Sequence, residues 1–271
     1  AGQIPPLPWT SLSPPDTGFT RPVSVSAPEG CILNAQPPSP TGGRHIIGHF
    51  VPGLIFAALA DAAPDAVQAD CGTMDLLTVQ GVHRDGRDVS TIYFAAGGFG
   101  ALEGMDGAAA TPGPSNMAVV PVEVWETLTG MTVERKVLLP DSGGPGTARG
   151  GLGQEVVLRN DSGHPMTIFS MANRTEFPAR GFHGGCPGGM RQHRINGELV
   201  HPKGHHVLAD GDVVTLVQAG GGGFGDPALR PVDKISADVR AGFVSAEAAR
   251  HDYSVKIDVA GLTASRLVAG E

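Results

Sequence analysis

Short runs of alternating hydrophobic and polar residues fill the middle of the chain, and this is the pattern of half-buried β-strands. β-Branched residues are frequent within the runs, and glycine, proline, aspartate and asparagine separate them. Asn196-Gly197 is a strong hairpin signal, and Asp210-Gly211-Asp212 is a second turn signal. The strands predicted from this pattern cover residues 21–26, 76–82, 90–97, 117–126, 131–139, 154–160, 165–171 and 213–220.

Three segments have the apolar spacing of a helix. The longest is 43–62, although Pro52 and Gly53 are expected to kink it or to split it in two. Residues 228–241 and 245–252 predict two short C-terminal helices, with Ser245 as the N-cap of the second. Together the elements predict a β-rich α+β fold with mostly antiparallel sheets, a helix near residues 43–62 and short helices at the C-terminal end.

Composition narrows the class of protein. The 271 residues include 40 glycines and 23 prolines, which indicates a turn-rich β protein because glycine supplies positive φ and proline fixes φ in loops. The net charge is −8, which argues against nucleic acid or an anionic membrane as the main partner. No apolar stretch has the length of a transmembrane helix. Nucleic acid and membrane are therefore not expected as partners.

The N-terminal region differs from the rest. Residues 1–20 are rich in proline, which is incompatible with a helix or a central strand, and they predict a linker or an extended arm that lies on a partner. Residues 21–271 are expected to form one domain, since no linker or repeat divides them. The three cysteines, Cys31, Cys71 and Cys186, are odd in number and far apart, which favours a reducing, cytoplasmic location.

Two glycine-rich motifs suggest chemistry that their context does not support. Residues 139–145 (LPDSGGP) are similar to the nucleophile segment of trypsin-like proteases, but Pro140 has no N–H to donate to an oxyanion. Residues 223–228 (GFGDPA) have the spacing of a dinucleotide-binding loop, but too little chain follows to complete a βαβ unit. We therefore interpret the first motif as a turn between strands, and nucleotide binding by the second is disfavoured.

The histidines form small clusters rather than complete metal sites. His45 and His49 share one helix face, His201, His205 and His206 cluster in a predicted loop, and His183 lies near Cys186. None of these groups supplies three or four ligands with a supporting carboxylate, so no metal is predicted in this chain.

Five ordered segments resemble the hydantoinase B/oxoprolinase B family, whose relatives include N-methylhydantoinase, 5-oxoprolinase, caprolactamase and the acetone and acetophenone carboxylases. The most specific is PDSGGPGTARGGLG at 140–153. The others are RPVSVSAPEGCILNAQPPSPTGGR at 21–44, AGGFG at 96–100, PGPSNMAVVPVEVWE at 112–126, and GGGGFGDP at 220–227 followed by DVRAGFVSAEAARHDYSV. The matches cover nearly the whole chain and are similar to the C-terminal half of the family's subunit.

The resemblance implies one half of a subunit in an ATP-dependent complex that hydrolyses cyclic amides of the hydantoin, oxoproline or lactam type. It implies a hydantoinase A-like partner that binds ATP and Mg²⁺, and a second chain that carries the other half with Zn²⁺ or Mn²⁺. The partner would phosphorylate a carbonyl or enol oxygen, and the intermediate would then be hydrolysed or, in ketone carboxylase relatives, carboxylated. A purely structural subunit and a stand-alone β-sandwich binding module are the competing hypotheses. The resemblance implies a small-molecule substrate, but the residues do not determine which one.

Six residues are candidates for substrate or interface contacts. Arg149, between glycines, is a candidate anion contact whose alternative is a turn-stabilising hydrogen bond. Asp141 is expected to shape the same turn, as is Ser142. Asn116 and Glu123 are expected to face a substrate tunnel or to cap strands, and Arg44 and His45 to begin a helix at an interface.

Overall fold

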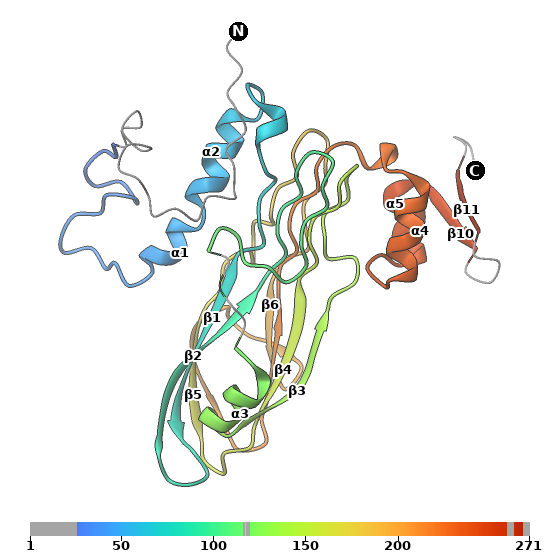
Figure 1. Ribbon diagram of the computed structural model, residues 1–271. Coiled ribbons are helices and arrows are strands. Elements are labelled where there is room, and N and C mark those ends of the chain that lie inside the picture. The colour runs from blue at the N-terminus through green and yellow to red at the C-terminus, as the bar shows by residue number, and fades with distance from the viewer. Residues whose placement is uncertain (1–25, 116, 118–119, 259–262, 268–271) are drawn as a thin grey trace. The chain divides into compact units, whose positions relative to one another are not determined.

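The computed structural model describes residues 26–115, 117, 120–258 and 263–267 (Figure 1). The chain divides into two compact units, Ala1–Gly48 and His49–Glu271. In the first unit a series of turns leads to α1 (Arg44–Gly48). The predicted arm at 1–20 and most of the predicted strand at 21–26 lie outside the described residues.

Two antiparallel sheets form the body of the second unit (Figure 1). The four-stranded sheet has the order β2-β1-β5-β8, formed by Asp88–Ala96, Met74–Val82, Met166–Met171 and Lys203–Leu208. The five-stranded sheet has the order β3-β4-β9-β6-β7, formed by Met131–Leu138, Gln154–Asn160, Val213–Val217, Gln192–Ile195 and Glu198–Leu199. Every described pairing within these sheets is antiparallel. The predicted α+β class with mostly antiparallel sheets is therefore confirmed.

The main core lies between the inner faces of the two sheets. Alternate residues of β4 and β5 are buried, as the alternating sequence pattern requires. Tyr93 of β2 and Trp125 pack edge to face within this core, with ring centroids 4.7 Å apart. Leucine, valine, isoleucine and methionine side chains from strands of both sheets complete it.

Helix α3 (Val122–Thr129) packs against β2 and β3, one strand from each sheet. Trp125 belongs to α3, which ends at Gly130 in a left-handed conformation. Predicting a strand over 117–126 was therefore wrong. Pro121 has no N–H and cannot donate a hydrogen bond to a neighbouring strand. Trp125 and Thr129 are four residues apart, so a helix places both on one buried face.

Other predicted elements are found with shifted ends. The segment 43–62 is split, as Pro52 indicated, into α1 and α2 (Val51–Leu59), and η1 (Pro64–Ala66) follows. The helix predicted at 228–241 is divided at Pro231 into η2 (Pro227–Leu229) and α4 (Val232–Arg240). The helix predicted at 245–252 is α5 (Ala246–Tyr253), and Ser245 caps it by accepting a hydrogen bond from Ala248 N.

Two turn signals gave correct connections, and one loop prediction was wrong. Asn196 and Gly197 both have positive φ between β6 and β7, as a tight hairpin turn requires. Asp210-Gly211 lies in the turn between β8 and β9. His205 and His206, predicted in a loop, lie on strand β8, where they pair with β5. The short hairpin β10 (Val255–Asp258) and β11 (Thr263–Arg266) packs beside α4 and α5 (Figure 1).

Glycine-rich extended segments continue beyond the ends of the strands and hydrogen-bond to one another rather than joining either sheet (Figure 1). We call this set the glycine bundle, and it comprises residues 67–72, 97–102, 106–110, 142–153, 179–189 and 218–225. Gly221 illustrates its packing: it donates to Gly151 O, accepts from Gly144 N, and a Cβ on it would lie 2.1 Å from Phe99 O. Because a side-chain atom at that distance would overlap the oxygen, close approach of backbones requires glycine here.

No helix among the described residues is long and apolar enough to cross a membrane.

Candidate functional site

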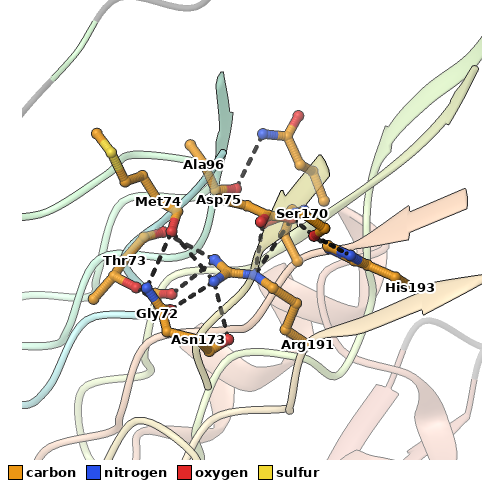
Figure 2. A network of polar contacts seen from close by, with 11 residues as sticks. Gly72, Thr73, Met74, Asp75, Ala96, Ser170, Asn173, Arg191 and His193 are labelled. Atoms are coloured by element: carbon orange, nitrogen blue, oxygen red, sulfur yellow. Dashed lines mark hydrogen bonds and ion pairs between the residues drawn. The ribbon is translucent and has the colours of Figure 1, made fainter. Parts of the chain in front are cut away.

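A buried polar network lies where the glycine bundle meets the two sheets (Figure 2). Asp75 of β1, Ser170 of β5 and His193 of β6 supply its first part, and each is at most 2% exposed. His193 Nδ1 lies 2.8 Å from Ser170 Oγ, and His193 Nε2 lies 2.5 Å from Asp75 Oδ2. These contacts join the four-stranded sheet to the five-stranded sheet through one imidazole ring.

Electrostatics determine how this network is protonated. Burial by itself would raise the pKa of Asp75, but the charges of His193 and Arg191 and the hydrogen bonds from His193 and Gln218 hold it well below its usual range. Asp75 is therefore a carboxylate that accepts hydrogen bonds. His193 Nε2 consequently carries a proton, which it donates to Asp75 Oδ2.

The order Ser–His–Asp is that of a hydrolytic triad, but this arrangement cannot receive a substrate as it stands. All three side chains are buried, so the Ser170 hydroxyl has no access to a carbonyl carbon in solution. The Asp75 contact is made by Nε2 and the Ser170 contact by Nδ1, the reverse of the protease arrangement. The geometry favours a structural role in which the three residues connect β1, β5 and β6.

Arg191 forms the second part of the network and is fully buried (Figure 2). Its guanidinium donates to the carbonyls of Gly72, Thr73 and Met74, which lead from the glycine bundle into β1. It also donates to Asn173 Oδ1 at 2.6 Å and to Gln218 Oε1 at 2.9 Å. Arg191 therefore supplies donors to backbone oxygens at the point where the glycine bundle enters β1, and Thr73 O accepts from Gly97 N as well.

A second network contains Arg149, the first of the sequence candidates. Arg149 Nε lies 3.3 Å from Asp238 Oδ2 of α4, Nη1 donates to Gly150 O, and the guanidinium stacks over Phe243. Its side chain is 6% exposed. The structure thus gives Arg149 protein partners, among them the expected turn-stabilising hydrogen bond, and its role as an anion contact stays a prediction.

Arg230 completes the second network. It binds Asp106 with both terminal nitrogens, at 2.7 and 2.8 Å, and Asp238 at 2.7 Å. Burial disfavours the charge of Arg230, but the hydrogen bonds and charges of Asp106 and Asp238 more than offset this and raise its pKa. Burial likewise would raise the pKa of Asp106, but Arg230 holds it below the usual range. These pairs attach the C-terminal helices to the glycine bundle.

Asp141 and Ser142 shape a turn, as the sequence indicated. Asp141 has a φ of 61°, and its carboxylate accepts a hydrogen bond from Ser245 N at 2.7 Å. Ser142 Oγ donates to Leu139 O at 2.6 Å and accepts from Gly153 N at 2.9 Å. The hydroxyl is engaged on both sides, which agrees with interpreting this segment as a turn rather than a nucleophile.

Four sequence candidates remain, and the structure places three of them. Glu123 is exposed in the first turn of α3. Arg44, whose Nη1 donates to Thr41 O, and His45 lie in α1 of the first unit. Asn116 lies outside the described residues. The roles of these four residues remain predictions.

A third polar cluster surrounds Asp70, which is 4% exposed. Arg180 Nε lies 2.9 Å from Asp70 Oδ2, and Arg174 Nη2 lies 3.5 Å from it. The neighbouring Cys71 Sγ accepts from Gly100 N at 3.4 Å. Burial nevertheless raises the pKa of the Cys71 thiol to about 11, so it is a poor nucleophile at neutral pH.

Neither a nucleotide loop nor a metal centre is formed by the described residues. The backbone N–H groups of Gly223, Phe224 and Gly225 donate to other segments of the glycine bundle, so they do not face a phosphate. In the part of the chain that the structure describes, no group of three or more histidine, cysteine, aspartate or glutamate side chains is arranged to hold a metal ion.

Sequence patterns missed most of the buried charges. Asp75 stands singly between apolar residues, Arg191 and His193 lie in the short polar run 191–194, and Asp238 and Arg230 lie in a region whose pattern indicates only helices. The one usable signal is a charged residue at an inward-facing strand position, as with Asp75 between Met74 and Leu76, because a buried charge requires a partner.

Comparison with known proteins identifies the family. The model of the hydantoinase B/oxoprolinase family matches residues 9–227, and the chain belongs to this family. It is 32% identical to the beta subunit of caprolactamase of Pseudomonas jessenii, over 92% of this chain and 46% of the relative. It is 29% identical to the B-type subunit of a putative D-/L-hydantoinase of Pseudomonas sp. (strain NS671), over 90% of this chain and 42% of the relative. The chain thus spans about half the length of these relatives.

Two solved structures have a similar fold. The ATP-dependent caprolactamase from Pseudomonas jessenii matches with a TM-score of 0.65 and 27% identity, over 75% of this chain and 38% of that chain. Nucleotide-free acetone carboxylase matches with a TM-score of 0.64 and 20% identity, over 76% of this chain and 33% of that chain. At 20% identity, the similarity to acetone carboxylase shows a shared fold alone.

Proposed function

We propose that this chain is one part of an ATP-dependent, multi-subunit enzyme that hydrolyses cyclic amides, and that it does not turn over substrate by itself. The observation that carries the proposal is the 32% identity to a caprolactamase beta subunit across 92% of the chain. The hydantoinase relative supports the same substrate class, because hydantoins and lactams both contain a ring amide.

The chemistry requires an activating partner. An unstrained amide is a poor electrophile, and phosphorylation of its carbonyl oxygen by ATP makes the carbonyl carbon more electrophilic. Water can then add to this carbon, the ring C–N bond breaks as the nitrogen takes up a proton, and hydrolysis of the remaining acyl phosphate releases inorganic phosphate. The phosphorylated intermediate must then be kept from bulk water until the intended reaction. We propose that a hydantoinase A-like partner binds ATP and Mg²⁺, and that the half of the relatives not covered by this chain binds Zn²⁺ or Mn²⁺.

The described residues support a scaffold role for this chain within such a complex. Within each of the two central networks the ionic groups are paired, and the side chains of Ser170, His193 and Asp75 are buried. A rigid unit of this kind can hold a reaction chamber in place while companion chains supply nucleotide and metal.

Reconstitution tests the proposal. The chain would be produced together with its hydantoinase A-like and companion polypeptides, and ADP release would be measured with hydantoin, 5-oxoproline or caprolactam. We expect ring opening coupled to ADP release in the complex and none with the chain alone. Amide hydrolysis by the isolated chain without ATP would overturn the proposal.

A ketone carboxylase is the second candidate, favoured by the fold shared with acetone carboxylase. The same complex would be given acetone or acetophenone with bicarbonate. Carboxylation of the ketone with no ring opening of any cyclic amide would replace the first proposal with the second. Assembly with neither activity would favour a purely structural subunit.

A further inference from the structure

Helix α2 is apolar on both of its faces. One face, formed by Phe56, Ala57 and Ala60, packs against the hydrophobic cluster of the glycine bundle. The opposite face carries Leu54, Ile55 and Leu59, which are 58%, 52% and 47% exposed. No charged residue occurs from Phe50 to Ala60. A helix without a polar face is typical of the interior of a larger assembly rather than of a protein surface.

A lipid surface is a poor match for this helix. Helices that lie on membranes combine an apolar face with a polar face rich in lysine or arginine, which attracts anionic headgroups. The second face of α2 is instead apolar and already occupied by the glycine bundle. The exposed face therefore calls for a protein surface.

A second copy of this chain is also a poor match. A stable dimer of separate chains buries roughly 800 Å² on each partner. Three half-exposed aliphatic side chains supply much less than that. The helix would, however, fit within a broad, obligate interface of the kind that resembles a domain core cut in half.

We propose that the Leu54–Leu59 face of α2 is the docking surface for the polypeptide that corresponds to the uncovered half of the relatives. This inference rests on the proposed function. The relatives are about twice as long as this chain, which covers 46% of the caprolactamase beta subunit and 42% of the hydantoinase relative. In those proteins the counterpart of α2 is therefore followed or preceded by as much protein again, and an apolar surface of that part covers the helix.

The test compares a double variant with a matched control. In Leu54→Glu/Leu59→Lys, both changed side chains are solvent-exposed, and the charges suit the two ends of the helix dipole, so the isolated chain should fold. Val207→Glu changes a residue that is 68% exposed on β8 and outside this surface. The binding partner in the test is the polypeptide from the same genome that matches the half of the relatives not covered by this chain. It is used as a separate chain, or as part of the same chain if the two are continuous.

Binding would be measured by titration calorimetry, and protection of residues 51–59 by hydrogen exchange. We expect amides of α2 to gain protection on complex formation, the double variant to bind at least about 100-fold more weakly, and Val207→Glu to bind as the wild type. If both halves belong to one polypeptide, binding cannot be titrated. The expected result is then that the amides of α2 are protected from hydrogen exchange in the wild type and lose this protection in the double variant.

Several outcomes would overturn the inference. The double variant could bind with unchanged affinity, or the amides of α2 could already be protected in the isolated chain. The isolated chain could form a concentration-dependent homodimer that the double variant loses, or could bind phosphatidylcholine or phosphatidylserine vesicles through α2. The genome could also encode no polypeptide of this kind. Failure of the proposed function is separate: a complex that protects α2 but hydrolyses no cyclic amide leaves the docking surface standing.

Discussion

His193 of the five-stranded sheet donates through Nε2 to the Asp75 carboxylate of the four-stranded sheet at 2.5 Å, and both side chains are at most 2% exposed. Removing the imidazole would leave a buried carboxylate without its neighbouring donor. We expect His193→Ala to lower the free energy of unfolding by about 3–5 kcal/mol, measured by urea denaturation. His164→Ala, at an exposed position, should change it by less than about 0.5 kcal/mol. A loss below about 1 kcal/mol in His193→Ala would contradict the structural role.

Acid should destabilise the chain through two carboxylates that are paired with cationic side chains. The pKa values of Asp75 and Asp106 are lower in the folded chain than the usual value near 4, so the unfolded chain binds more protons as the pH falls below about 4. The stability that these groups contribute is complete above that pH and decreases as the pH drops toward the folded-state pKa values. Urea denaturation between pH 6 and pH 3 should show this decline, with a shallower slope in Asp106→Asn. Identical slopes in the two proteins would exclude Asp106 as a source.

A single methyl group should disrupt the glycine bundle. The Cβ of Gly221→Ala would lie 2.1 Å from Phe99 O, so backbone segments must separate. We expect a loss of more than about 4 kcal/mol, or no folded protein. Gly48→Ala is the matched control, because its Cβ meets nothing within 4 Å and alanine favours the helix. Near-equal melting temperatures of the two variants would show that the packing at Gly221 is looser than described.

Arg149 offers a way to separate a structural role from an anion contact. Arg149→Ala removes the ion pair with Asp238 and the stacking on Phe243, and we expect it to cost about 2–4 kcal/mol in the isolated chain. Differential scanning calorimetry measures this without substrate. If the isolated variant keeps its stability while the assembled enzyme loses activity, the anion contact is supported instead.

Cys71 should react slowly with alkylating reagents. Its pKa is raised to about 11 by burial, so on the order of one thiol in a thousand is ionised at pH 8. Labelling with iodoacetamide, followed by mass spectrometry, should accelerate about tenfold for each pH unit between pH 8 and pH 10. A rate that is already at its plateau at pH 8 would show that the thiolate is stabilised.

Much of the sheet structure could be predicted because its strands alternate. In β4 and β5 every second residue is buried, and the period of two is visible in the sequence. The Asn196-Gly197 turn was equally predictable, since the positive φ values there favour this residue pair. The edge strand β8 was missed because Lys203, Gly204, His205 and His206 contain no apolar alternation, and the ladder with β5 determines its conformation.

The polar networks could not be predicted because their members meet only through the fold. Asp75 and His193 are 118 residues apart, and Arg149 and Asp238 are 89 apart. The glycine neighbours of Arg149 make it a candidate in the sequence, but its conformation depends on a helix that follows much later in the chain. The high glycine content of the glycine bundle is evident in the sequence. The arrangement of its segments is not, because it depends on hydrogen bonds between segments such as 142–153 and 218–225.

The glycine bundle also has a calorimetric consequence. Its interior consists largely of peptide groups, whereas an ordinary core consists of hydrocarbon. Exposure of apolar surface raises the heat capacity of a protein, and exposure of polar surface lowers it. Unfolding of this chain should therefore show a heat-capacity increment per residue below the usual range of about 12–15 cal/mol/K. Its stability curve would then be flatter, so the folded state would persist over a wider span of temperatures than its modest hydrophobic content suggests.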